Sequence, residues 1–512
     1  MHTPDPRRWW GLGALSLALL ALGFDLTILN VALPTLSAEL RASTSELQWI
    51  VDSYILVFAA LLLPAGLLGD RFGRKRLLLA GLALFGAASL GGALTDGTTG
   101  VIAARTCMGL GAAIVMPLSM SMLPAIFPPH ERTRAVAVWS ASMALGLPLG
   151  PLLGGWLLEH YWWGSIFLVN VPVVVLGGVA VAFLLPESRD PAAPRIDVPG
   201  AVLSTAGLAA LVYGVIEGPV RGWADPLTLG AVLGGLALLA LLVRWEARAA
   251  EPLMDLALFR DRVFVWAMAA GVVGTLVMAG VLFVLPQYLQ VVQGHDAFGT
   301  GLRLIPMLAG LMAGGLLTDR LVPRTGAKPV MGAGLPTLAA GLGAGAFTGT
   351  GDSYAFTAAW LTVLGLGIGL TMVPAMDAVL ARLPDGQAGR GSGLVQALRQ
   401  TAAALGVAGL GSLVSSVYRG EVSTGALPQK AADLARDSVG GAASVAAELG
   451  DPALLASARD AYVSGMGAAL AVCALATFVA GLLLWVFLPA VPPRRASDPA
   501  DAAESDHEHV AS

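Results

Sequence analysis

The sequence predicts an all-α membrane protein of about fourteen transmembrane helices, arranged as two six-helix bundles with two inserted helices. Of its 512 residues, 56% are hydrophobic, only 12% are charged and 64 are glycine, a composition too apolar for a soluble chain of this length. Long apolar runs recur from Trp9 to Leu488, and many have the roughly twenty residues that a helix needs to cross a bilayer. The alternating pattern of transmembrane strands is absent, so we expect helices.

Each predicted helix is a long apolar run that ends near charged or turn-forming residues. In chain order the expected spans are 10–34, 47–68, 77–94, 99–123, 135–158, 163–185, 198–217, 227–245, 263–292, 300–318, 327–347, 355–380, 393–418 and 462–488. Cytoplasmic loops of membrane proteins hold most of the lysine and arginine. With both termini cytoplasmic, the six short external loops hold only Arg41 and Arg221, which supports this order of spans.

An internal repeat divides the chain. The letters GLLGDR at 66–71, after the second span, nearly match GLLTDR at 315–320, after the tenth span. Two similar halves around a central site are a common plan of transporters. We therefore expect four parts, which are an N-terminal bundle (1–190), an inserted helix pair with linkers (191–260), a C-terminal bundle with an external segment at 419–461 (261–490), and a disordered cytoplasmic tail (491–512).

Several classes of protein are excluded by what the sequence lacks. The net charge of −4 leaves no basic face for a nucleic acid. Cys107 and Cys473 fall in apolar spans, so we expect neither a disulfide nor a metal site, and no phosphate-binding loop of an ATPase is present. His130-Glu131 has no second histidine at the spacing of a zinc protease. We expect no cofactor and no enzymatic activity.

Ionisable residues inside the spans are the candidate functional residues, because charge at hydrocarbon depth is costly. At 1.5 Å per residue, Asp25, Asp52 and Arg105 reach a similar depth in the outer half of the first bundle. We expect Asp25 to be the main acid that couples proton movement to transport, with Arg105 as the neighbour that tunes it. The alternative is that Asp25 and Arg105 form a static ion pair with no part in proton movement. Asp52 is expected nearer the surface, where it is simply hydrated unless it also carries protons. Asp377 and Arg399 form a possible second charge pair.

Two short motifs combine glycine with charge or with proline. In GLLGDRFGRKR at 66–76, glycines lie at a turn beside an Asp-Arg pair, and its candidate gating residues are Gly66, Asp70, Arg71, Gly73 and Arg74. In GLPLGPLLGG at 146–155, small residues allow close helix packing while prolines remove backbone hydrogen bonds and kink the helix. The residues of this second motif are Gly146, Pro148, Gly150, Pro151, Gly154 and Gly155.

With these motifs the chain resembles the major facilitator superfamily, and within it the fourteen-span drug:proton antiporters that confer multidrug or antibiotic resistance. The segment 66–76 matches the superfamily's loop between spans 2 and 3, and 146–155 matches the motif of its antiporters. The segment 105–111 resembles its proton-transfer motif, and Asn170-Val171-Pro172 fits the start of span 6. The resemblance implies that Asp70 and the nearby arginines lock the inward gate by charge pairs that break when the halves rock.

The expected function is therefore proton-coupled antiport across the cytoplasmic membrane, which exports drugs or antibiotics by alternating access and uses the proton gradient as its energy source. The expected partners are a small organic substrate, protons and the lipid bilayer, and we expect a monomer. Two alternatives stay open. One is an exporter of an endogenous metabolite, lipid or siderophore on the same plan, and the other is a channel.

Overall fold

The computed structural model describes residues 8–189, 197–248, 256–382, 388–425 and 427–489. Within these ranges the chain forms helices and no strand. The first half contains α1 (Arg8–Glu39), α2 (Thr44–Phe72), α3 (Arg74–Ala93), α4 (Thr98–Ser121), α5 (Leu123–Ile126), α6 (Pro129–His160), α7 (Ser165–Leu168) and α8 (Asn170–Leu184). Two helices follow, α9 (Val198–Arg221) and α10 (Pro226–Glu246).

The second half begins with the short 3-10 helix η1 (Leu256–Arg260). It continues with α11 (Arg262–Gln287), the π-helix η2 (Tyr288–Val292), α12 (Ala297–Arg303), α13 (Ile305–Thr325), α14 (Ala327–Gly345), α15 (Tyr354–Leu380), α16 (Ala388–Glu421), α17 (Gln429–Asp437), α18 (Val439–Leu449) and α19 (Pro452–Phe487). Polar side chains start several of these helices. Ser43 and Glu46 form a reciprocal capping box on α2, and Asp225, Asp261 and Asp451 cap α10, α11 and α19.

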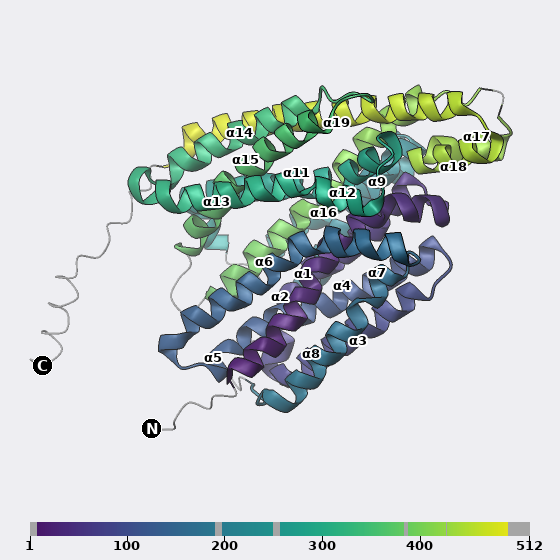
Figure 1. The fold of residues 1–512 in the computed structure, drawn as a ribbon. Coiled ribbons are helices and arrows are strands. Elements are labelled where there is room, and N and C mark those ends of the chain that lie inside the picture. Colours follow the sequence, from purple (N-terminus) through teal and green to yellow (C-terminus); the bar gives the residue numbers. More distant parts are fainter. Residues whose placement is uncertain (1–7, 190–196, 249–255, 383–387, 426, 490–512) are drawn as a thin grey trace, which may run out of the picture.

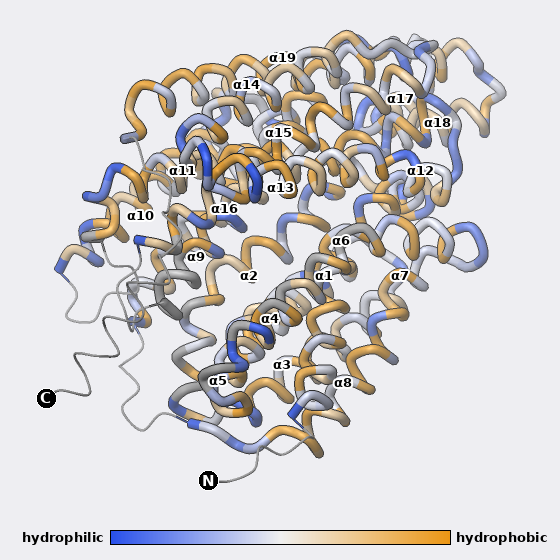
Figure 2. The backbone as a smooth tube through the Cα atoms, turned by 60° about the vertical axis from the view of Figure 1, so that its left-hand side comes forward, coloured by the Kyte–Doolittle hydropathy of each residue, from blue (hydrophilic) through white to orange (hydrophobic). Residues whose placement is uncertain are grey.

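The expected count of fourteen crossings is matched in part. Among the described residues, twelve helical stretches are long and apolar enough to cross a membrane. The other two expected ranges are also helical. Helix α6 has 32 residues and is described only in part, and α14 has 19 residues and does not meet that criterion. Figure 2 shows hydrophobic residues along the helices and hydrophilic ones concentrated near their ends. The fold is thus all-helical and of the membrane-spanning kind.

Three predicted ranges differ from the helices. The range 163–185 is two helices, α7 and α8, with a break at Val169, and the range 300–318 falls on α12 and α13, with a break at Leu304. The helix that holds the last predicted span begins at Pro452 and not at residue 462, so the segment expected outside at 419–461 contains α17, α18 and the start of α19. The predicted tail after residue 490, with its histidines, lies outside the described residues.

The helices form two groups that meet at one end of the molecule (Figure 1). Helices α1 to α8 lie in the lower group of that view, and α11, α13 to α15 and α19 in the upper group. The groups contact each other through α2 with α16, α6 with α12, and α1 with α11 and α18. Helix α9 packs against both α2 and α16, while α10 packs on α9. The end at which α1 finishes and α2 begins is called the closed end below.

Candidate functional site: a buried charge network next to the closed end

A buried ion pair lies between α1 and α4. The guanidinium Nη1 of Arg105 donates to Oδ2 of Asp25 at 2.7 Å, and the two residues are 2% and 1% exposed. Arg105 Nε also donates to the backbone oxygen of Ile50 at 3.2 Å, and its guanidinium lies 4.1 Å from the ring centre of Tyr54. Asp25 and Arg105 were expected at a similar depth, and the structure places them in direct contact. Three helices of the first half converge on this pair.

The second oxygen of Asp25 is bound by a residue that the charge analysis did not single out. Asn170, the first residue of α8, donates from Nδ2 to Asp25 Oδ1 at 3.0 Å. The same nitrogen donates to the hydroxyl of Ser89 on α3, also at 3.0 Å, and that hydroxyl donates to the backbone oxygen of Phe167 at 2.8 Å. Asn170 and Ser89 are fully buried. The carboxylate of Asp25 therefore has one cationic and one neutral donor, from different helices.

Asp52 lies in a different environment from the one expected. It is 0% exposed, and neither of its carboxylate oxygens has a hydrogen-bond partner among the described residues. The expectation of a hydrated acid near the surface is therefore wrong. The prediction judged the depth of Asp52 from its distance along the helix. Helix α2 packs on α4, α9 and α16, and the side chain of Asp52 is buried although it lies near the start of the helix. A buried carboxyl group without hydrogen-bond donors is costly, which makes Asp52 a candidate functional residue.

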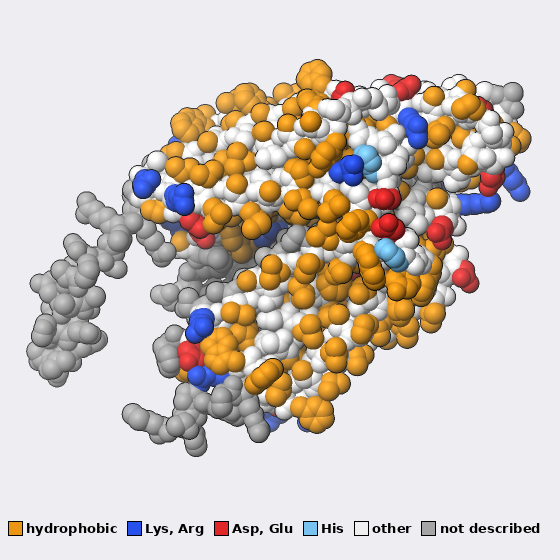
Figure 3. All heavy atoms as spheres, in the orientation of Figure 1, with side chains coloured by type: hydrophobic (Ala, Val, Ile, Leu, Met, Phe, Trp, Pro, Cys, Tyr) orange, Lys and Arg blue, Asp and Glu red, His pale blue; other side chains and the backbone are white. Residues whose placement is uncertain are grey.

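The two halves are joined at the closed end by hydrogen bonds between neutral groups and, on its exposed rim, by the ion pair of Arg41 with Glu448 at 3.4 Å. Ser37 Oγ lies 3.0 Å from Ser438 Oγ, and Thr44 Oγ1 donates to the backbone oxygen of Asp437 at 2.7 Å. Gln290 Nε2 donates to the backbone oxygen of Val31 at 2.7 Å. Among the described residues, the hydrogen bonds between the halves all lie at this end. Toward the opposite end, the face drawn in Figure 3 is hollowed between the two groups.

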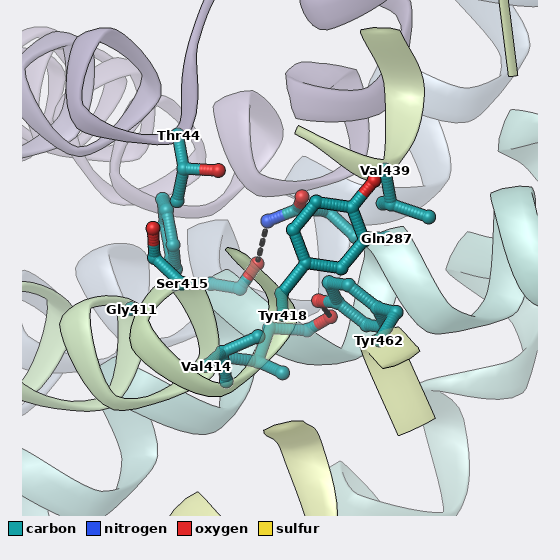
Figure 4. A pocket seen from close by; sticks show the side chains of 10 residues that line it. Thr44, Gln287, Gly411, Val414, Ser415, Tyr418, Val439 and Tyr462 are labelled. Carbon is teal, nitrogen blue, oxygen red and sulfur yellow. Dashed lines mark hydrogen bonds between the residues drawn. The ribbon is translucent and has the colours of Figure 1, made fainter. Parts of the chain in front are cut away.

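A small cavity lies inside this closed end (Figure 4). Its volume of about 10 Å³ is room for about one water. Thr44 of α2 lines it from the first half, while Gln287, Ser415 and Tyr418 line it from the second half. Tyr418 also donates from its hydroxyl to the backbone oxygen of Ala435 at 2.7 Å, which ties α17 to α16. The closed end therefore leaves little empty space between the halves.

The glycines at 146–155 bring α6 against two neighbours. A Cβ at Gly146 would lie 2.6 Å from the backbone of Gly23, and one at Gly150 would lie 2.7 Å from the backbone oxygen of Phe24. Gly154 packs on Ile28 in the same way. A Cβ at Gly155 would lie 2.5 Å from the Cα of Phe298, which is on α12 of the other half. The motif thus packs α6 tightly on α1 and, at its last glycine, on the second half.

The same contact is made from the other side by α12. A Cβ at Gly301 would lie 2.5 Å from the backbone oxygen of Pro151. The side chain of Pro148 lies outside the described part of α6. Glycine is required at these positions because the backbones themselves are in contact.

The loop between α2 and α3 binds within its own half. Gly73 has φ 113°, a left-handed value that favours glycine. Arg74 Nη1 donates to the backbone oxygen of Ser121 and to Ser188 Oγ, both at 3.3 Å, and Arg71 is exposed. Gly66 packs on Pro117. The side chain of Asp70 lies outside the described residues, so its charge lock stays a prediction.

The second charge pair also stays a prediction. Arg399 is half-buried on α16, and its Nε donates to Thr275 Oγ1 at 3.4 Å. Asp377 is exposed on α15.

Sequence reasoning gave Asn170 no role beyond its place in a motif, and it missed Ser89. Both side chains are neutral, and the search considered charged groups. The signal for Asn170 was present, because an amide two residues before Pro172 is a polar residue in an otherwise apolar span. Polar side chains within such spans need hydrogen-bond partners just as charged ones do.

Comparison with known proteins identifies a family. Residues 15–407 match the model of the Major Facilitator Superfamily. The tetracenomycin C resistance and export protein of Streptomyces glaucescens is 32% identical over 522 residues, covering 97% of this chain and 95% of that protein. The multidrug efflux pump LfrA of Mycolicibacterium smegmatis is 34% identical, covering 95% of this chain and 97% of its own.

Solved structures agree on the fold. A bacterial homologue of the human lysosomal transporter Spinster, in an inward-facing and occupied conformation, has a TM-score of 0.67 at 16% identity, covering 95% of this chain and 98% of that one. A D-xylose-proton symporter has a TM-score of 0.59, also at 16% identity, covering 94% and 98%. At these identities the likeness concerns the fold.

Proposed function

This chain belongs to the major facilitator superfamily and is a multi-pass protein of the cell membrane, and on that premise we propose that it exports small organic compounds in exchange for protons. The observation that carries the proposal is the buried acid network of Asp25 with Arg105 and Asn170, placed in the same half as the enclosed Asp52. Ionisable groups at membrane depth are costly and mark transport pathways.

The proposed cycle alternates between two arrangements of the halves. In the arrangement described, bonds such as Ser37 with Ser438 close one end, and the opposite end is hollowed between the halves. With both termini cytoplasmic, as the distribution of lysine and arginine favours, the closed end is external and substrate enters from the cytoplasm. Rocking of the halves then breaks the closed end and releases substrate outside.

Asp25 and Asp52 are the proposed proton carriers. Protonation from outside and release inside, with substrate and proton competing for the same chamber, give antiport. Arg105 and Asn170 stabilise the carboxylate of Asp25 when the proton has left. Asp52 has no such donors, so it favours the protonated form in this arrangement.

The proposed cargo is a drug or an antibiotic. The names of the two relatives above refer to tetracenomycin C and to multidrug efflux. An endogenous metabolite, lipid or siderophore is the second candidate. The proposal further includes a monomer without cofactor or catalytic activity, driven by the proton gradient, with the domain limits 1–190, 191–260 and 261–490.

Expression of the chain in an efflux-deficient bacterium tests the cargo. The proposal predicts resistance to several antibiotics or cationic dyes, lost when a protonophore collapses the proton gradient. Resistance to none of the compounds would favour the metabolite exporter, and resistance that survives the protonophore would contradict proton coupling.

A further inference from the structure

The hydrogen bonds around Asn170 have a fixed direction. Ser89 has a single hydroxyl hydrogen, which it donates to the backbone oxygen of Phe167 at 2.8 Å. The Asn170 atom that lies 3.0 Å from Ser89 Oγ must therefore be the donor, the amide nitrogen. That nitrogen uses its other hydrogen on Asp25 Oδ1. The backbone oxygen of Phe167 can only accept, and this fixes the donor and the acceptor in each hydrogen bond from Phe167 back to Asp25.

The other end of the same amide is unused. Oδ1 of Asn170 is buried and accepts no hydrogen bond from the described residues. A buried acceptor without a donor costs free energy, so a tightly packed site usually avoids it. In this arrangement the amide thus uses only its donor side, and its acceptor remains available to a donor such as a protonated carboxyl group.

We propose that Asn170 detects the protonation state of Asp25 and that Ser89 transmits it to the break between α7 and α8. This inference rests on the proposed role of Asp25 in proton coupling. When Asp25 carries a proton on Oδ1, its O–H needs an acceptor. Asn170 supplies one by a half-turn of its amide, which exchanges Nδ2 for Oδ1 and moves Nδ2 to the position that Oδ1 now holds, where no described residue accepts from it. Arg105 continues to donate to Oδ2.

The half-turn changes what Ser89 does. Its oxygen loses the amide donor and faces Oδ1 instead, so the hydroxyl hydrogen turns from Phe167 to Asn170. The backbone oxygen of Phe167 then loses a bond at the end of α7. It shares the Val169 N–H with the backbone oxygen of Ser165, two residues earlier. One proton added to Asp25 thereby removes a hydrogen bond at the break between α7 and α8. No other charged group has to move.

Few other ionisable groups face this chain. Arg105 comes from α4 and Tyr54 from α2, and α2 also carries the buried Asp52. The sequences of α7 and α8 contain no ionisable residue, and those of α1, α3 and α6 carry theirs near the helix ends apart from Asp25 itself. The response to pH at this site is therefore that of a small, defined set of groups.

Infrared titration of the full chain in detergent, without substrate, tests the detection step. The carboxylic C=O band that is absent from Asp25→Asn belongs to Asp25, and its growth with falling pH gives a midpoint. Asn170→Leu removes a bond to the charged carboxylate and a weaker bond to the neutral acid, so the midpoint should move to higher pH by about one unit. For the Ser89→Ala variant used below, Ser53→Ala is the matched control, because Ser53 is also a buried serine that donates to a backbone oxygen, that of Ile102 at 3.4 Å.

Labelling of phenylalanine with a ¹³C carbonyl tests the transmission step, with Phe167→Leu to identify the band. We expect the Phe167 band to rise in frequency as Asp25 takes its proton, and to be independent of pH in Ser89→Ala. An unchanged Asp25 midpoint in folded Asn170→Leu, a Phe167 band that ignores pH in the unaltered chain, or no titrating Asp25 band would overturn the inference. Proton-coupled transport that still depends on Asp25 would leave the proposed function standing in the first two cases.

Discussion

The side-chain nitrogen of Gln48 on α2 lies 2.9 Å from the backbone oxygen of Ala408 on α16, a hydrogen bond between the two halves of the protein. The same nitrogen lies 3.3 Å from the oxygen of Val407. Gly411 permits this approach, because a Cβ there would lie 2.5 Å from that nitrogen. The closed end is therefore held by neutral groups, and by an exposed ion pair of Arg41 with Glu448, whose bonds can break at modest cost.

Loss of the Gln48 amide should favour opening of the closed end. Neutral hydrogen bonds contribute about 1 kcal/mol each, so Gln48→Leu should raise the open population about fivefold. The measurement is the rate at which a thiol reagent labels Ser415→Cys, in a background with Cys107→Ser and Cys473→Ser. Gln429→Leu is the control, because Gln429 bonds to Asp433 within one helix. Equal labelling in both variants would contradict this role for Gln48.

A methyl group between α6 and α12 should prevent closure. In Gly301→Ala the new Cβ meets the Pro151 oxygen, and overpacking of this kind costs about 1–3 kcal/mol. We expect about tenfold slower transport of tetraphenylphosphonium in vesicles. Gly230→Ala in α10 meets nothing within 4 Å and should transport normally. Normal transport by Gly301→Ala would show that this contact is not needed.

The buried ion pair should be more sensitive to the loss of one partner than of both. Removing one charge from such a pair costs about 3–5 kcal/mol, because the other is left buried without compensation. Arg105→Met should therefore lower Tm in detergent more than the double variant Asp25→Asn with Arg105→Met. A double variant that is the less stable of the two would argue against an ion pair.

His295 should make stability depend on pH at the closed end. Burial, aided by the nearby Arg303 and opposed by Asp296, lowers the pKa of His295 below its usual value. The unfolded chain then binds the proton first as pH falls, so the contribution of neutral His295 is complete above about pH 6.5 and is lost below it. His295→Gln should show a slightly smaller fall in Tm between about pH 8 and pH 5. An identical fall in both proteins would remove His295 from the pH response.

Much of the fold follows from local properties of the chain. A run of twenty apolar residues must be a helix in lipid, so each expected span falls on a helical stretch, although the start of α19 differs from the expected residue by ten positions. The pairing of Asp25 with Arg105 was also accessible, since depth along a helix follows from residue number. The roles of Asp70 and of Asp377 with Arg399 stay predictions.

What covers a helix end depends on packing between distant segments. The hairpin of α17 and α18 reaches across to α1 through Ser438, 401 residues from Ser37, and no local pattern places it there. The burial of Asp52 was missed for the same reason. The contact of Gly155 with α12 likewise depends on how the halves dock, although the glycine itself was recognised as a packing residue.

The most direct test of the account is proton flux in vesicles that contain the purified chain. Addition of an exported compound should drive protons across the membrane in the unaltered protein, and Asp25→Asn should abolish this flux while the protein still folds and binds the compound. Flux at the full rate in Asp25→Asn would contradict the assignment of Asp25 as the coupling acid.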